Sequence, residues 1–79
     1  MNITFSKHSL LKLGHRNISR EKVLQTLQSP DYILPSYADR MRAYKRFGKL
    51  YLKVVFKRER GDILVITQYW DEKFKSPTI

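Results

Sequence analysis

The alternation of side chains between residues 41 and 57 constrains the fold of this chain more than any other feature. Apolar residues occupy every second position from Leu50 to Phe56, with tyrosine, lysine or valine between them. In a β-strand this period places the apolar set on one face of a sheet. Gly48 and Lys49 separate this run from a similar one, so we predict strands over 41–47 and 50–57 joined by a two-residue turn.

The segments on either side predict two further strands. β-branched residues dominate 63–69, which we expect to be the central strand, after a glycine-containing hairpin loop over 58–62. Residues 31–37 predict a weaker strand, and Pro35 within it favours an edge position because proline cannot donate to a ladder.

The first third of the chain predicts a short strand and two helices. Residues 2–6 alternate between polar and apolar and indicate a strand. We expect a helix over 7–13, or as far as Arg16, with a serine or asparagine cap before it. A second helix is expected over 20–28, capped by Ser19 and ended by a Ser-Pro pair.

Short helices followed by a meander of strands define the α+β class. We predict two N-terminal helices packed on one face of a mainly antiparallel sheet. At 79 residues the chain has room for a single domain, 1–79. The residues expected in its core are aliphatic or aromatic: Val23, Leu24, Leu27, Val54, Phe56, Leu64 and Ile66.

The end of the chain is polar and predicts little regular structure. We expect the tail, 71–79, to be flexible, with one helical turn over 71–75. Trp70 and Phe74 are expected to pack rather than to stack on bases.

The composition excludes several classes of protein. The absence of cysteine excludes disulfide scaffolds, thiol catalysis and cysteine-based zinc sites, and fits a reducing cytosol. The N-terminus lacks the apolar segment of a signal peptide, and the longest strongly apolar run, 63–66, is far too short to span a bilayer. We therefore expect a cytoplasmic protein that does not enter the membrane. No P-loop, GxGxxG or HExxH motif is present, so we expect no metal and no other cofactor.

Positive charge is concentrated in the middle of the chain. Lys and Arg number 16 against 7 Asp and Glu, for a formal net charge of +9. Nine of the basic residues lie between 40 and 60, together with one acid, Glu59. In so short a chain this favours a polyanionic partner, first a nucleic acid and second an acidic protein or a membrane surface.

The strand alternation gathers many of these cations on one face of the predicted sheet. The polar positions of the two runs carry arginine, lysine and tyrosine: Arg40, Arg42, Tyr44, Arg46, Tyr51, Lys53 and Lys57. Phosphates would bind the cations, and unstacked bases could lie on Tyr44 or Tyr51. Alternatively, the strands are charged only for solubility, although charges of mixed sign would serve that purpose equally.

A second polar cluster follows the first predicted helix. Four residues fall within roughly 100° of arc at the helical period: His8, Lys12, His15 and Arg16. Leu10 and Leu13 lie on the opposite side, where they can meet the sheet. Histidine exchanges a proton near neutral pH and cations stabilise an anionic phosphorane, so this cluster suits metal-independent cleavage of RNA. Alternatively, His8 bonds a local backbone group at the helix start and His15 lies at the surface or caps the helix end.

Several motifs resemble a family of small prokaryotic domains of unassigned function. Those domains carry T-K-H-A, then R-G-I-S-x-E-x-V, then N-P, and close with an "lrVvv … iiViTvY" hairpin. The matching runs here are Phe5-Ser-Lys-His8, Arg16-Asn-Ile-Ser-Arg-Glu-Lys-Val23, Ser29-Pro30, 52–56 and 63–69. Asn17 replaces the usual glycine, which is tolerable because asparagine also adopts left-handed backbone conformations.

The family looks like a relative of the BrnT and RelE toxins. This resemblance implies a RelE-like fold, metal-independent cleavage of RNA (ribosome-bound mRNA included), and neutralisation by an acidic or DNA-binding antitoxin. It also implies that His8 and Arg16 form the polar signature of the family. Sites of the RelE type draw on sheet cations and aromatic residues, for which Arg42, Tyr44, Lys53 and Tyr69 are the candidates here.

The leading hypothesis from the sequence is a toxin-type endoribonuclease. Its catalytic residues would be His8 for proton transfer, Arg16 and Arg42 for the phosphate, Lys53 for charge, and Tyr44 or Tyr69 for the nucleotide. The residues expected to bind nucleic acid are Lys12, His15, Arg40, Tyr44, Arg46, Tyr51 and Lys57. The alternative is a non-catalytic basic module that binds nucleic acid or protein and needs no histidine. A third reading is a structural protein that self-associates through the Pro35 edge strand.

Overall fold

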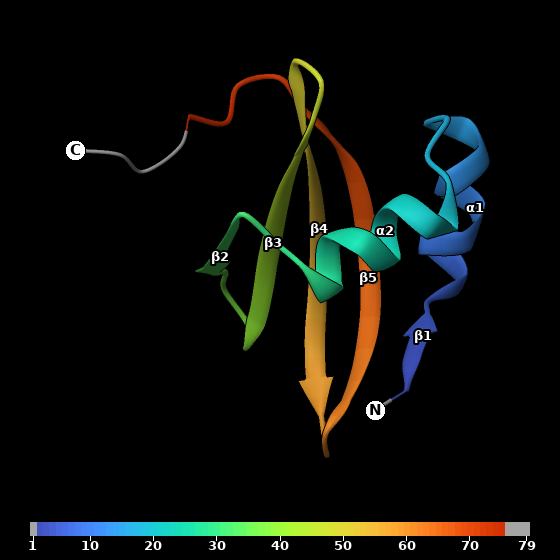
Figure 1. The fold of residues 1–79 in the computed structure, drawn as a ribbon. Coiled ribbons are helices and arrows are strands. Elements are labelled where there is room, and N and C mark those ends of the chain that lie inside the picture. The colour runs from blue at the N-terminus through green and yellow to red at the C-terminus, as the bar shows by residue number, and fades with distance from the viewer. Residues whose placement is uncertain (1, 76–79) are drawn as a thin grey trace.

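A five-stranded mixed sheet carries two helices on one of its faces (Figure 1). The computed structural model describes residues 2–75. Its elements follow one another as β1 (Ile3–Phe5), α1 (Lys7–His15), α2 (Arg20–Gln28), β2 (Tyr32–Pro35), β3 (Arg40–Phe47), β4 (Leu50–Glu59) and β5 (Asp62–Asp71). The predicted α+β layout of helices against a sheet is therefore confirmed. No helix in the described part of the chain is long and apolar enough to cross a membrane.

Serine side chains begin both helices, as predicted. The Oγ of Ser6 accepts a hydrogen bond from the N–H of Ser9 (3.0 Å), and the Oγ of Ser19 accepts one from Lys22 (3.2 Å). Each bond satisfies an N–H that has no partner within the first helical turn. Between the helices, Asn17 has a φ of 54°, so asparagine supplies the left-handed residue for which glycine is usual.

The two hairpins have tight turns. Gly48 has a φ of 67° in the β3–β4 turn, and Arg60 and Gly61 have φ values of 52° and 85° in the β4–β5 turn. Positive φ suits the twist of two-residue hairpins. The second turn is shorter than the predicted loop over 58–62, because strand pairing continues to Glu59 opposite Asp62.

The sheet order β1-β5-β4-β3-β2 adds to one expectation and corrects another. The sheet is mainly antiparallel, but β1 pairs in parallel with β5, from Ile3 opposite Ile63 to Phe5 opposite Val65, so it is not a pure meander. The added strand also makes β4, not β5, the central strand. β2, which contains Pro35, lies at the far edge as predicted.

A β-bulge in β5 changes which of its residues face the helices. Val55 pairs with Thr67 and Phe56 pairs with Val65, which leaves Ile66 as an extra residue. Side chains at Val65 and Gln68 consequently both turn toward the helices and are buried. Because of this shift Leu64 lies on the helix-free face, so its predicted place in the core was wrong.

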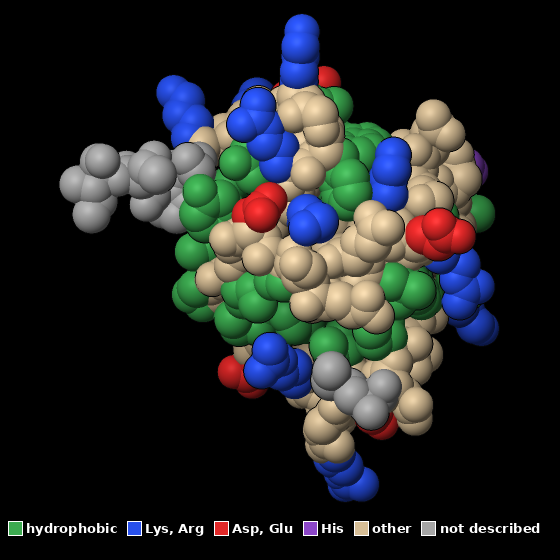
Figure 2. All heavy atoms as spheres, viewed as in Figure 1, with side chains coloured by type: hydrophobic (Ala, Val, Ile, Leu, Met, Phe, Trp, Pro, Cys, Tyr) green, Lys and Arg blue, Asp and Glu red, His purple; other side chains and the backbone are tan. Residues whose placement is uncertain are grey.

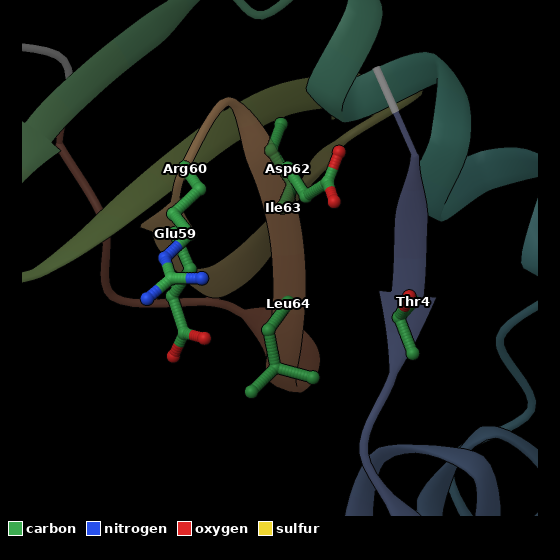
Figure 3. Close-up of a pocket in the computed structure, with 6 residues that line it drawn as sticks. All are labelled: Thr4, Glu59, Arg60, Asp62, Ile63 and Leu64. Carbon is green, nitrogen blue, oxygen red and sulfur yellow. The ribbon is translucent and has the colours of Figure 1, made fainter.

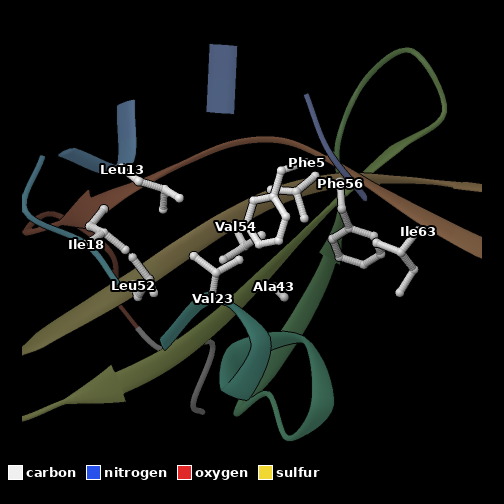
Figure 4. Packing of buried hydrophobic residues seen from close by; sticks show 10 residues of the cluster. Phe5, Leu13, Ile18, Val23, Ala43, Leu52, Val54, Phe56 and Ile63 are labelled. Carbon is white, nitrogen blue, oxygen red and sulfur yellow. The ribbon is translucent and has the colours of Figure 1, made fainter. Parts of the chain in front are cut away.

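The core lies between the helices and the sheet (Figure 4). Its buried residues come from β1, both helices, the α1–α2 loop and β3 to β5: Phe5, Leu13, Ile18, Val23, Ala43, Leu52, Val54, Phe56, Ile63 and Val65. Leu24 and Leu27 pack against this cluster and are partly buried. Ile66 is not part of it, because it is the bulged residue.

The inward face of α1 differs from the prediction. Leu10 is 46% exposed, whereas Ser9 is fully buried. The Oγ of Ser9 donates to the Oε1 of Gln68, and the Nε2 of Gln68 donates to the carbonyl of Ser9 (3.0 Å). A reciprocal polar pair therefore holds α1 to β5 at a position where a leucine was expected.

The end of the described chain continues β5 rather than forming a helix. The strand runs to Asp71, and 72–75 contains no helical turn, so the turn expected over 71–75 is absent. Trp70 packs against the core from the last part of the strand, as expected. The flexible tail expected over 71–79 includes 76–79, which lie outside the described residues.

Candidate nucleic-acid interface

The face of the sheet opposite the helices, called here the open face, carries five of the seven cations of β3 and β4. Strand register assigns to it these residues: Tyr32, Leu34, Arg40, Arg42, Tyr44, Arg46, Tyr51, Lys53, Val55, Lys57, Leu64, Thr67, Tyr69 and Asp71. All of the β3 and β4 residues that the sequence assigned to a basic face lie there. The strand alternation therefore predicted this face correctly.

Three polar residues form a row across the centre of the open face. Tyr44 on β3 lies opposite Lys53 on β4, which lies opposite Tyr69 on β5. The Nζ of Lys53 donates a hydrogen bond to the Oη of Tyr69 (2.7 Å) and lies 5.0 Å from the centre of its ring. Because the Tyr69 oxygen accepts this bond, its own O–H can donate to a ligand.

The surroundings of Lys53 keep its ammonium charged. Partial burial alone would lower the pKa of Lys53, but the hydrogen bond with Tyr69 and the nearby oxygens of Tyr44, Tyr69 and Asp71 outweigh it. The net effect raises the pKa above the ordinary value of 10.5. Lys53 is therefore a cation at neutral pH and not a general base.

Arg42 supplies a second cation beside this row. Its Nη1 donates to the Oη of Tyr44 (3.2 Å) and its Nε donates to the carbonyl of Pro35 (3.1 Å). Arg42 lies opposite Val55, two residues from Lys53 on β4, and such diagonal neighbours are about 7–8 Å apart. Arg42 and Lys53 are thus close enough to contact one strand of phosphates together.

Arg16 brings a third cation from the end of α1. β1 covers the outer edge of β5 only as far as Val65, and Arg16 binds the edge beyond it. Its Nη1 donates to the Oγ1 of Thr67 (3.1 Å) and to the carbonyl of Gln68 (2.8 Å). Its guanidinium carbon lies 5.5 Å from the centre of the Tyr69 ring. Arg16 and Lys53 therefore both contact Tyr69.

Phe74 packs as expected, but it does so over the open face, a position that the sequence did not predict. Its ring stacks on Tyr44 with 3.7 Å between centroids and 14° between planes. Tyr44 is consequently only 1% exposed. The expectation that a base could lie on Tyr44 is therefore not met while Phe74 is in place. No local pattern in the sequence predicts this contact, because Tyr44 and Phe74 are 30 positions apart in the chain.

The remaining open-face candidates lie around the central row. Tyr51 meets Phe74 edge to face, with 5.0 Å between centroids. The Nε of Arg46 donates to the carbonyl of Gly48 (2.8 Å). Lys57 pairs with Glu59 at 3.5 Å, which partly neutralises it, and Arg40 lies opposite Lys57.

The two histidines do not join the cations of the sheet. Ser9 and Leu13 mark the inward side of α1, and His8 and His15 lie about 120–140° around the helix from it. Both are exposed, and within residues 2–75 neither side chain has a hydrogen-bond or ion-pair partner. His8 and Arg16 lie about 12 Å apart along the helix axis. The predicted convergence of imidazoles with the sheet guanidiniums is therefore absent.

Lys12, also predicted to bind nucleic acid, lies on α1 between the inward and outward sides and is half-buried. It belongs to the helix layer, so only Arg16 from the predicted helix cluster joins the open face.

The helix side of the molecule has a different distribution of charge. Figure 2 shows Lys and Arg side chains standing apart on this side, with Asp and Glu among them. The open face, by contrast, presents one acid near its central row, Asp71, against the three cations Arg16, Arg42 and Lys53.

A shallow pocket at the β4–β5 hairpin is a separate feature (Figure 3). It is lined by Thr4, Glu59, Arg60, Asp62, Ile63 and Leu64. Six residues of strand separate Glu59 from Lys53, which corresponds to about 20 Å. Residues 2–75 contain no group of three or more acidic or histidine side chains that could hold a metal ion. The pocket therefore adds no ligand set to the cation cluster.

The chain belongs to a family described as a domain of unknown function (DUF4258), whose model matches residues 5–70. The match includes every element of the fold except the first residues of β1 and the last of β5. No curated protein and no solved structure matches the chain.

Proposed function

We propose that this protein binds single-stranded RNA on the open face of its sheet. The observation that carries the proposal is the gathering of Arg16, Arg42 and Lys53 around Tyr44 and Tyr69, on a face that no helix covers. Arginine and lysine bind phosphates, and tyrosine rings beside them suit unstacked bases. An acidic protein would satisfy the cations but gives no reason for the aromatic residues among them.

A direct test is fluorescence anisotropy with a labelled single-stranded RNA of about twelve nucleotides. We expect the double variant R42Q/K53Q to bind at least tenfold more weakly than the wild type, because each lost phosphate contact removes attraction and counterion release. The matched control is R20Q/K22Q, which removes the same charge from exposed positions on α2. Equal losses in the two variants would mean that net charge alone, rather than the open face, binds RNA.

A second candidate function is metal-independent cleavage of that RNA, as in toxin-type endoribonucleases. The Lys53–Tyr69 hydrogen bond favours it, because it places a protonated amine and a phenol O–H between Arg16 and Arg42. In this reaction the 2′-oxygen forms a bond to phosphorus while the bond to the 5′-oxygen breaks. The 2′-proton passes to water, Lys53 donates a proton to the leaving oxygen, and the phenol of Tyr69 stabilises the phosphorane. Water then returns the proton to Lys53.

Such cleavage would leave a 2′,3′-cyclic phosphate and a 5′-hydroxyl. The test is to incubate purified protein with mRNA in chelator, with and without ribosomes. We expect K53Q to abolish cutting, Y69F to slow it, and H8A to leave it unchanged because His8 lies outside the cluster. Absence of cutting in both settings, or cutting that depends on His8, would refute this assignment.

The toxin hypothesis also implies a neutralising partner. An acidic antitoxin that covers the open face would compete with RNA for Arg42 and Lys53. Slow growth on induction, rescued by a small acidic protein encoded beside this one, is the expected cellular result. A relationship to RelE-like toxins would fit the helices-on-sheet layout and remains part of this proposal.

A further inference from the structure

Three tyrosines on the open face form a seat for a flat ring, called here the aromatic seat. Tyr44 is its floor, and Tyr32 and Tyr51 stand next to each other beside it, with 6.2 Å between the centroids of their rings. Tyr32 lies directly opposite Tyr44 in the sheet register. The strands therefore fix all three rings, and the seat does not depend on a loop for its shape.

Phe74 occupies this seat. It stacks on Tyr44 at 3.7 Å, and its centroid lies 5.7 Å from that of Tyr32 and 5.0 Å from that of Tyr51. The nearly parallel stack, with the other rings tilted around it, is an arrangement in which aromatic side chains hold nucleobases. Phe74 takes the position that a base would take.

The segment that carries Phe74 is held weakly by its backbone. Residues 72–75 belong to no strand or helix. The hydrogen bond that holds them within the described chain runs from the N–H of Lys73 to the Oδ1 of Asp71 (3.0 Å). Removal of Phe74 from Tyr44 would therefore break no sheet hydrogen bond, and ring contacts are what keep it in place.

The seat borders the cations of the central row. The Oη of Tyr44 accepts a hydrogen bond from Arg42 (3.2 Å), and Lys53 lies directly opposite Tyr44. A ligand that combined a flat ring with an adjacent phosphate could therefore use the seat and the cations together. Nucleotides have this combination.

We propose that the aromatic seat is a nucleobase-binding site and that Phe74 occupies it until a base of the bound RNA replaces it. This inference rests on the proposed RNA binding and extends it, because it names the base contact and an internal competitor. One face of Tyr44 cannot hold both rings at 3.7 Å. Phe74 therefore weakens base binding without affecting phosphate binding.

The test compares wild type, F74A and F74L with two probes, a labelled twelve-nucleotide RNA and inorganic polyphosphate of similar charge. We expect F74A to bind RNA about threefold to tenfold more tightly, since the energy of a ring stack no longer opposes the base. F74L keeps an apolar side chain over Tyr44 but no stacked ring, so its RNA affinity should rise less than that of F74A. Affinity for polyphosphate, which has no base, should be unchanged. The control is Y37A, because Tyr37 is an aromatic residue outside the seat and 81% exposed.

The outcomes separate this inference from the proposed function. If R42Q/K53Q weakens RNA binding but F74A leaves it unchanged or weakens it, the seat is not a base site that Phe74 blocks. A gain for polyphosphate equal to that for RNA would also overturn the inference, because the tail would then obstruct phosphate rather than base. If no variant binds RNA while polyphosphate binding persists, the proposed function fails as well. Thermal unfolding of each variant checks that the fold is retained.

Discussion

At the scale of single residues, Arg16 and Gln68 link the two layers of the molecule. Gln68 binds Ser9 of α1 through its side chain and Arg16 through its carbonyl. A helix that is fixed in this way holds its terminal guanidinium beside Tyr69. The same contacts that stabilise α1 on β5 thus position a candidate phosphate ligand.

Loss of one partner of the Ser9–Gln68 pair should destabilise the protein more than replacement of both partners. S9A removes the hydroxyl partner of a fully buried amide, and we expect a loss of about 1–3 kcal/mol in the free energy of unfolding. In S9A/Q68L both polar side chains are gone, so we expect part of that stability to return. Urea denaturation measures both values, and additive losses in the double variant would contradict this account.

Lys53 makes a pH-dependent contribution to stability. Its pKa is raised in the folded protein, so its stabilising effect is complete below the unfolded value of about 10.5 and is lost as the pH rises through the folded value. We expect the stability difference between wild type and K53Q to stay constant from pH 8 to about pH 10 and to shrink above it. Urea midpoints across this range measure it. K49Q, which removes one lysine from an exposed position in the β3–β4 turn, is the matched control.

At the scale of elements, the bulge in β5 decides the composition of the open face. Before the bulge, Ile63 and Val65 face the helices; after it, Gln68 and Trp70 do so. If Ile66 were paired instead of bulged, strict alternation from Val65 would turn Thr67 and Tyr69 toward the core. Tyr69 meets Lys53 on the open face because the bulge leaves Ile66 out of the alternation.

Deletion of Ile66 should therefore leave both layers intact. Thr67 would follow Val65 directly, so Gln68 and Trp70 would still face the helices and Tyr69 would still lie on the open face. We expect a loss of no more than about 1–2 kcal/mol in stability, similar to that of the control I66A, which keeps the bulge. Thermal unfolding compares the two variants, and failure of the deletion variant to fold would contradict this account of the register.

At the scale of the whole molecule, the fold separates apolar packing from charge. One face of the sheet packs against both helices, and the other presents five of the seven cations of β3 and β4. Side-chain alternation in the strands predicts both faces of the sheet. The tertiary structure adds Arg16 at one edge of the open face and Phe74 over Tyr44.

RNA binding by this face should depend strongly on salt. Each phosphate contact with a single strand contributes a slope of about −0.7 in log affinity against log salt concentration. With Arg16, Arg42 and Lys53 engaged, we expect a slope of about −2, and K53Q should reduce its magnitude by about 0.7. Anisotropy titrations at salt concentrations from about 50 to about 300 mM measure this slope. An unchanged slope in K53Q would mean that Lys53 contacts no phosphate.

The sequence predicted the elements well because their signals are local. Ser6 and Ser19 lie at the helix starts where capping patterns placed them, and the hairpin at Gly48 joins the expected strands. The candidate site was predicted in part. The β3 and β4 cations share a face as expected, whereas His8 and His15 point away from it, because helical spacing alone does not reveal which side of a helix is buried.

The chain by itself determined the secondary structure and the basic face of the two central strands, since a period of two residues is written directly in their side chains. Only the tertiary structure decided the parallel pairing of β1, the phase of β5 after its bulge, the outward direction of the histidines and the stacking of Phe74 on Tyr44. These features depend on contacts between residues about 30 to 60 positions apart, and the energy of such contacts appears only when the layers pack together.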